Sequence, residues 1–199
     1  MSSSAERIIH TRLADGTAIC IRKIVPGDGA RMREGIARLS DRSRYLRFFS
    51  VQPMPPPQVI ERLLAADGHE HIAWGAIASD LPGKPAIGAV HAIADERGAG
   101  SVEFSVGVID EFHGRGVGRL LTATILLDAA DHGYVEFQAS TLAENVGAIA
   151  FLNVLGAELT GREDHVLDYR LSIAEAVEAL RAECTPPGIA DVFAAFRKR

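Results

Sequence analysis

The chain has 199 residues, of which 47% are apolar, and a formal net charge of −5, so we expect one hydrophobic core and no nucleic acid partner. Its two cysteines, Cys20 and Cys184, are too few and too far apart for a disulfide scaffold or a zinc site. No apolar run reaches the roughly 18 residues that span a membrane, and residues 1–7 lack the apolar region of a signal peptide. These features predict a cytoplasmic protein with a flexible N-terminus over residues 1–7 and without membrane contact.

The chain is predicted to begin with a hairpin and three helices. The two strands, residues 8–13 and 17–23, flank Asp15-Gly16, which is a strong turn signal. Asp28 and Ser40 suit the N-caps of the first two helices, because their side-chain oxygens can accept hydrogen bonds from free backbone amides. The helices are expected to run from Asp28 to about residue 39, over residues 40–49 and over residues 58–66.

The rest of the chain alternates strands and helices. Further strands are expected at residues 72–78, 86–93, 101–109, 134–142 and 165–171, with helices at residues 119–132 and 145–155. This order mixes hairpins with two strand–helix–strand crossovers. It therefore predicts an α/β (α+β) fold in which a mixed sheet carries helices on both faces.

Residues 172–199 are predicted to form a helical extension beyond a domain of residues 8–171. Ser172 and Glu175 have the spacing of a capping box, and two apolar stripes with helical periodicity follow it. Such stripes must be covered. Either the chain's own core or a second subunit can cover them, so a homodimer is one of two open expectations.

A glycine-spaced loop joins the strand over residues 101–109 to the next helix. Gly114, Gly116 and Gly118 can adopt positive φ, which lets the backbone amides and the helix N-terminus face an anion, and two arginines stand beside them. A Walker A loop needs Lys-Ser/Thr after its last glycine, but Arg119 and a leucine follow here. A dinucleotide fingerprint needs G-x-G-x-x-G, whereas the spacing here is G-x-G-x-G. A turn without a ligand is the other interpretation.

This loop resembles the acyl-CoA-binding motif of the GNAT superfamily of N-acetyltransferases, V-x(4)-Q/R-x-x-G-x-G/A. Val108, Gly116 and Gly118 match it, and His113 stands where Gln or Arg is usual. The resemblance implies the GNAT fold, a mostly antiparallel twisted sheet of about seven strands, with acetyl-CoA as cosubstrate. The residues that it assigns to the cofactor are Val106, Gly107, Val108, His113, Gly114, Arg115, Gly116, Val117, Gly118, Arg119 and Asn145.

Asn145 belongs to a second segment that resembles a cofactor motif of the same family, N-x-x-A-i-x-x-Y-x-x-x-G-F. Asn145, Ala148 and Gly156 match this motif, which implies that Asn145 contacts the CoA arm. Alternatively, Asn145 is only a helix N-cap. Leu152 stands where the family often has the tyrosine that protonates the leaving thiolate, so this chain lacks that acid.

A general base is expected on the strand before the loop. A lysine-like amine with a pKa near 10.4 is only about one part in 2,500 neutral at pH 7, a deficit of roughly 4–5 kcal/mol, and a base removes much of that barrier. Glu103 shares the polar face of the strand with Ser105 and Gly107, and we predict that it is the base. It could instead be an ordinary, partly exposed strand residue.

The first third also resembles the acetyltransferase domain of bacterial protein-lysine acetyltransferases. The matching segments are Leu13-x-Asp15-Gly16-Thr17, Ile21-Arg22, Asp28 and Leu39-Ser40-x-x-Ser43-x-Tyr45-x-Arg47-Phe48-Phe49. This resemblance implies a protein lysine as acceptor and Glu103 as base. Direct attack in a ternary complex is expected, because neither cysteine lies near the glycine loop in the sequence. Two other functions stay open: acetylation of a small amine or antibiotic, and acyl-CoA sensing without catalysis.

Two further features bear on binding. Residues 31–47 carry six arginines, which indicate either a solvated helix face or a surface that steers an acidic partner. His69-Glu70-His71 has two metal-binding side chains but no third ligand nearby in sequence. We therefore predict no metal site.

Overall fold

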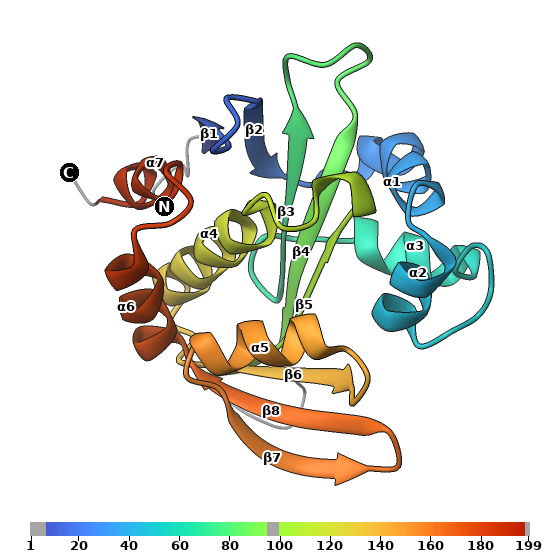
Figure 1. The fold of residues 1–199 in the computed structure, drawn as a ribbon, viewed down its shortest axis with the longest axis vertical. Coiled ribbons are helices and arrows are strands. Elements are labelled where there is room, and N and C mark those ends of the chain that lie inside the picture. The colour runs from blue at the N-terminus through green and yellow to red at the C-terminus, as the bar shows by residue number, and fades with distance from the viewer. Residues whose placement is uncertain (1–6, 95–99, 198–199) are drawn as a thin grey trace.

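The computed structural model describes residues 7–94 and 100–197, which form one eight-stranded sheet in the order β1-β2-β3-β4-β5-β6-β8-β7 (Figure 1). Among the described strands, only β5 and β6 pair in parallel. The strands are β1 (Ile8–Arg12), β2 (Ala18–Lys23), β3 (His71–Ala78), β4 (Ala86–Ala94), β5 (Ser101–Val108), β6 (Glu136–Leu142), β7 (Glu158–Glu163) and β8 (Val166–Ser172).

Helices cover both faces of the sheet, as predicted. The α4 helix packs on β3, β4 and β5, with α6 and α7 beside it, whereas α1 packs on β4 from the other side together with α2 and α3 (Figure 1). The helices are α1 (Gly29–Ala37), α2 (Asp41–Phe48), α3 (Pro57–Leu64), α4 (Val117–Asp131), α5 (Val146–Val154), α6 (Ile173–Glu183) and α7 (Ile189–Ala195), with short 3-10 turns η1 (Pro26–Asp28) and η2 (Asp110–Phe112). Among the described helices, none combines the length and the apolarity that crossing a bilayer requires.

The prediction of about seven strands was one short, because β7 was missed. Its sequence, Glu-Leu-Thr-Gly-Arg-Glu, is exposed at nearly every position, and Leu159 is 58% exposed. An edge strand with two solvated faces has no alternation of apolar and polar residues for periodicity to detect. A register shift between Leu159 and Gly161 interrupts the pattern further.

The predicted cap at Asp28 was wrong, whereas the cap at Ser40 is confirmed. Asp28 precedes α1, but its carboxylate makes no cap; it accepts two hydrogen bonds from Arg22 at 2.8 and 2.6 Å and one from the amide of Val25. The guanidinium is the stronger partner, and its hydrogen bonds lower the pKa of Asp28. Ser40 accepts from the amide of Ser43 at the start of α2.

The C-terminal helices dock on this chain's own core. The α6 and α7 helices both contact α4, and α7 also contacts β1, where Thr11 donates to Asp191 at 2.6 Å. Four apolar residues of the predicted stripes are at most 3% exposed; these are Ile173, Leu180, Ile189 and Val192. These stripes were expected to pack either on the chain's own core or on a second subunit, and the structure shows them packed on the core.

Ser172 caps α6 by accepting a hydrogen bond from the amide of Glu175. Replacing Ser172 with Ala leaves this amide without its partner, and we expect the free energy of unfolding to fall by about 1 kcal/mol. Ser172→Asp keeps an acceptor at the same place and should stay near wild type. Chemical denaturation of the three proteins measures the difference, and an Ala variant as stable as the Asp variant would contradict the cap.

Candidate active site

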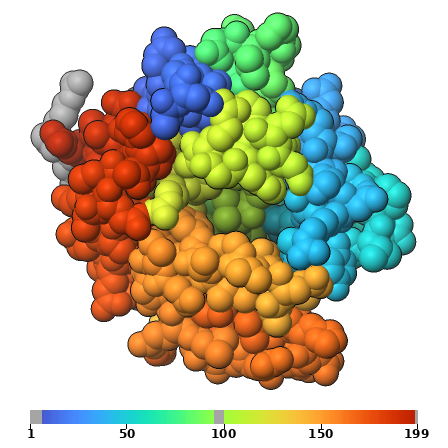
Figure 2. All heavy atoms as spheres, in the orientation of Figure 1, coloured from blue at the N-terminus to red at the C-terminus, as the bar shows by residue number. Residues whose placement is uncertain are grey.

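The central feature of the site is a divergence of β5 and β6. The β5 strand pairs with β4 from Val102 to Val108, but it pairs with β6 only over Ser101–Glu103. Beyond Glu103 no described strand lies beside the edge of β5 that faces β6, so the backbone groups of this edge can pair with an extended ligand, except that the Val108 carbonyl already accepts a hydrogen bond from His113. Figure 2 shows the surface hollowed between α4, α5 and α2, with the central strands at the floor.

The glycine loop follows η2 at the end of this open edge. Gly114 and Gly116 have φ of 70° and 90°, and α4 begins with the buried Val117. Within the described residues, no backbone carbonyl accepts a hydrogen bond from the amides of residues 114–119. Free amides at a helix N-terminus form an anion site. The loop therefore has the geometry that a diphosphate requires.

Gly116 and Gly118 allow close packing around the loop. A β-carbon on Gly116 would lie 2.6 Å from Cγ of Pro186, in the segment between α6 and α7, so only glycine fits there. A β-carbon on Gly118 would lie 3.8 Å from Cγ2 of Val108, an ordinary contact. The C-terminal extension thus touches the loop on one side while β5 supports it on the other.

His113, predicted to contact the cofactor, has a partner within the protein. Its Nε2 donates a hydrogen bond to the carbonyl of Val108 at 2.8 Å. This bond ties the loop to the last residue of β5. His113 therefore fixes the direction in which the strand enters the loop.

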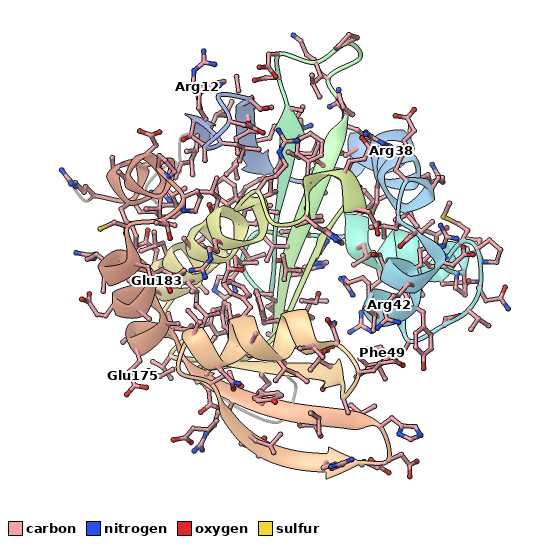
Figure 3. All side chains as sticks on the ribbon, in the orientation of Figure 1. Arg12, Arg38, Arg42, Phe49, Glu175 and Glu183 are labelled. Atoms are coloured by element: carbon pink, nitrogen blue, oxygen red, sulfur yellow. The ribbon has the colours of Figure 1, made fainter. Side chains whose placement is uncertain are left out.

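The two loop arginines are held by carboxylates from distant parts of the chain. Arg115 donates to Asp15 and, at 2.7 Å, to Thr17, both in the turn between β1 and β2. Arg119, in the first turn of α4, pairs with Glu183, the last residue of α6 (Figure 3). Both cations border the loop as predicted, but a ligand phosphate would compete with these carboxylates for them.

Asn145 is the N-cap of α5, where its side chain accepts from the amide of Ala148 at 3.2 Å. The cap interpretation therefore holds, and a contact with the CoA arm stays a prediction. Leu152, at the position of the family's tyrosine, is 4% exposed within the core. Beside Asn145, Glu144 lies 3.8 Å from Arg42 of α2, which is labelled in Figure 3.

Glu103 is exposed on the face of β5 that α2 covers, on the same side as Ser105 and Gly107. Arg47 of α2 lies along this face: its guanidinium donates to Ser105 Oγ at 2.8 Å, and a β-carbon on Gly107 would lie 3.6 Å from its Cδ. Burial lowers the pKa of Arg47 to about 10, although the charge of Glu103 opposes the shift. Sequence reasoning did not select Arg47 as a site residue, although the Arg47-Phe48-Phe49 run lay within the resemblance.

Asp110 holds α2 over the sheet. Its carboxylate accepts hydrogen bonds from the amide of Ser40 at 2.9 Å and from the hydroxyls of Ser40 at 2.6 Å and Ser43 at 2.8 Å. Partial burial opposes the effect, but these bonds lower the pKa of Asp110. Because Asp110 directly follows β5 and Ile109, the same turn positions the glycine loop and the helix that carries Arg47.

A buried histidine pair lies behind Ser105. His91 of β4 is opposite Ser105 in the register, and its Nδ1 is 3.0 Å from Nε2 of His71. The two side chains are 1% and 7% exposed, and burial lowers the pKa of both. The sequence suggested His71 only as a metal ligand, and nothing in the local pattern indicated its pairing with His91.

A cavity of about 110 Å³ adjoins the same face, between the sheet and α1–α3. Its floor is a row of small residues in register across three strands, Gly75, Ala89 and Gly107. Apolar side chains of the helices form most of its roof, and Arg47 borders it on the side of β5. Among the described residues, no group of three or more His, Cys, Asp or Glu side chains comes together to hold a metal ion.

Comparison with known proteins gives one family. The model of the acetyltransferase (GNAT) family matches residues 40–157. Acetyltransferase Pat of Mycolicibacterium smegmatis is 28% identical over 149 residues, which are 75% of this chain and 44% of that protein. This chain thus spans less than half the length of the curated relative it matches.

Solved structures share the architecture. The GNAT domain of S. lividans PAT superposes with a TM-score of 0.76 at 24% identity, covering 86% of this chain and 99% of that one. The PaiA N-acetyltransferase from Thermoplasma acidophilum, solved in complex with coenzyme A, gives a TM-score of 0.59 at 16% identity, covering 77% and 98%. At these identities the likeness concerns the fold, and the fold class expected from the sequence is confirmed.

Proposed function

Because the chain belongs to the acetyltransferase (GNAT) family, we propose that it transfers an acetyl group from acetyl-CoA to a primary amine, with Glu103 as general base. The observation that carries this proposal is the open edge of β5, which leads from Glu103 directly to a loop of free amides. A long ligand with an anionic end and an amide-containing arm fits such a track. Acetyl-CoA has both parts.

In this proposal the diphosphate lies on the amides of residues 114–119 and the pantetheine arm pairs with Val106–Val108 as an added strand. The thioester then lies on the strand between Val106 and Glu103. The resemblance of the loop to the family's cofactor motif supports this order. Arg115 and Arg119 would add charge where the phosphates displace Asp15 and Glu183.

The reaction proceeds by direct attack in a ternary complex. The acceptor nitrogen attacks the thioester carbonyl carbon, Glu103 takes a proton from this nitrogen, the carbon–sulfur bond breaks, and CoA leaves as a thiolate. The exposed carboxylate of Glu103 is open to an amine that enters from the side of α2. Neither free cysteine belongs to the residues that form this site, so a cysteine-bound acyl intermediate has no support.

A protein lysine is the acceptor we favour, and the similarity to acetyltransferase Pat supports it. A small amine is the other acceptor class, and the loss of the tyrosine at Leu152 is the observation that favours an acyl-CoA sensor instead. A cytoplasmic location and a homodimer stay predictions.

Binding of acetyl-CoA is best tested at Gly114. This residue has φ of 70°, and no atom lies within 4 Å of the point that a β-carbon would occupy, so the two side chains that best tolerate this conformation, Asn and Asp, should both fit. Gly114→Asp adds a negative charge beside the diphosphate, and we expect affinity for acetyl-CoA to fall about tenfold or more, whereas the isosteric Gly114→Asn should bind nearly as wild type. Gly116 is unsuitable, because a β-carbon there meets Pro186.

Thermal unfolding with and without acetyl-CoA measures the effect. Ligand at ~100 times its dissociation constant should stabilise the wild type and Gly114→Asn by about 2.7 kcal/mol, and Gly114→Asp clearly less. Equal stabilisation of both variants by acetyl-CoA would show that the diphosphate does not bind at this loop. A folded wild type that shows no shift at all would overturn the acyl-CoA proposal.

A further inference from the structure

Arg47 carries a charge whose partners in the described chain are few. Its side chain is half-buried, Ser105 Oγ is its one hydrogen-bond partner among the described residues, and its guanidinium carbon lies 5.0 Å from the centre of the Phe48 ring. An arginine head has five N–H donors. Glu103 acts on it only through the longer-range attraction between their charges. Taking a cation even partly out of water with most of its donors unpaired is costly, which points to an anion that completes the site.

The position of Arg47 limits where this anion would be. The aliphatic stem crosses Gly107, and the head ends at Ser105, in the middle of the open part of β5. Glu103 follows on the same face, about 6.6 Å further along the strand. Since Ser105 Oγ accepts from Arg47, its own proton is free to donate to a ligand. Two donors therefore meet beside the stretch assigned to the thioester.

The CoA thiolate is an anion that the proposed reaction produces, and none of the chain's tyrosines is placed to protonate it. The family's tyrosine position is the buried Leu152. Tyr134 donates to the carbonyl of His69, and burial raises its pKa, while Tyr169 is 6% exposed in the core. Tyr45 precedes Arg47 by two residues, about 200° around α2, and so points away from Ser105.

We propose that Arg47 and Ser105 form the subsite that holds the sulfur of CoA as a thiolate when the carbon–sulfur bond breaks. The inference rests on the proposed function. The electron pair of that bond stays on sulfur, Arg47 keeps its proton and stabilises the charge, and Ser105 donates a hydrogen bond. The thiolate later takes the proton that Glu103 removed from the amine. Charge stabilisation by Arg47 thus replaces protonation by the missing tyrosine.

The subsite can be tested without turnover, by comparing coenzyme A with desulfo-coenzyme A, in which hydrogen replaces the thiol. A thiol ionises near pH 8.5. If the bound thiol ionises about one pH unit lower, coenzyme A should gain about sevenfold in affinity over the desulfo compound between pH 6.5 and pH 9. Calorimetry gives the ratio of the two dissociation constants, and thiolate absorbance of bound coenzyme A gives an independent reading.

Three variants test which residue is responsible. Arg47→Gln should reduce the sevenfold gain to less than twofold, and Arg47→Lys should retain part of it because the charge is kept. Arg162→Gln removes the same charge from an exposed position of β7, at the far edge of the sheet, and should behave as wild type. A merely structural role of Arg47 would weaken both compounds equally and leave their ratio intact, which would overturn the proposal.

The outcomes separate the two proposals. If both compounds bind the wild type and their ratio does not change with pH, the thiolate subsite is wrong and the acetyltransferase proposal stands. If neither compound binds the folded wild type, the proposed function itself fails, and the subsite fails with it.

Discussion

Glu103→Gln should lower the turnover number by about 10²- to 10⁴-fold at pH 7, because the amide cannot take the proton of the attacking amine. Affinity for CoA should be unchanged, since the proposed diphosphate site is at the other end of β5. The loss should shrink as the pH rises towards the pKa of the amine, where the acceptor loses its proton to water. Release of CoA from acetyl-CoA, with poly-lysine as acceptor, measures the rates.

Glu163→Gln is the matched control for this experiment. Glu163 is an exposed strand carboxylate on β7, at the far edge of the sheet, and its loss should leave the rate as in wild type. A turnover number for Glu103→Gln within a few-fold of wild type would show that Glu103 is not the general base. If the wild type binds acetyl-CoA but acetylates neither poly-lysine nor a panel of small amines, the sensor function takes precedence.

The free energy of unfolding should fall by roughly 2–4 kcal/mol between pH 7 and pH 5 because of the pair His71 and His91, since each histidine that titrates near 6.5 when unfolded and stays neutral when folded contributes up to about 2 kcal/mol. Burial lowers the pKa of both in the folded protein; the nearby Arg47 adds to the effect on His91, and Asp67 opposes it on His71. In the unfolded chain both titrate near pH 6.5. Below that pH the unfolded state binds protons that the folded state does not, so stability decreases as the pH falls.

His91→Gln tests this assignment, because glutamine can keep a hydrogen bond to His71 without titrating. Its stability should depend on pH at most half as steeply between pH 6.5 and pH 5, because His91 has the larger pKa shift of the two. The carboxylates with lowered pKa, including Asp28 and Asp110, lose their contribution only below about pH 4, so they do not obscure this window. An unchanged slope in denaturation curves of the variant would show that other groups dominate.

Elements with a local signal were predictable from the sequence. The turn at Asp15-Gly16, the cap at Ser40 and the glycine loop each depend on residues within a few positions, and the structure has all three where they were expected. β7 was not predictable, because it is held by pairing with β8 rather than by apolar residues of its own. Asp28 shows the same limit, because its carboxylate bonds the guanidinium of Arg22 instead of capping the helix that follows Asp28.

The site was predictable only along β5 and the loop. Glu103 and residues 106–119 lie within one short stretch of the sequence, so strand alternation and glycine spacing suffice to select them as candidates. Arg47 comes from a helix 58 residues before Ser105, and His91 from a neighbouring strand. Charges on a helix usually indicate a solvated face. Only the packing of α2 on β5 shows that one of these arginines is turned inward.

The contact of Pro186 with Gly116 also has a thermodynamic consequence. The C-terminal extension touches the loop through Pro186 and through the pair Glu183–Arg119, while acetyl-CoA would touch it from the solvent side. Two binding events that share one loop are linked, and linkage is reciprocal. If docking of the extension changes the affinity for the cofactor by some factor, bound cofactor must change the docking equilibrium of the extension by the same factor. The docking of the last two helices would therefore report cofactor occupancy.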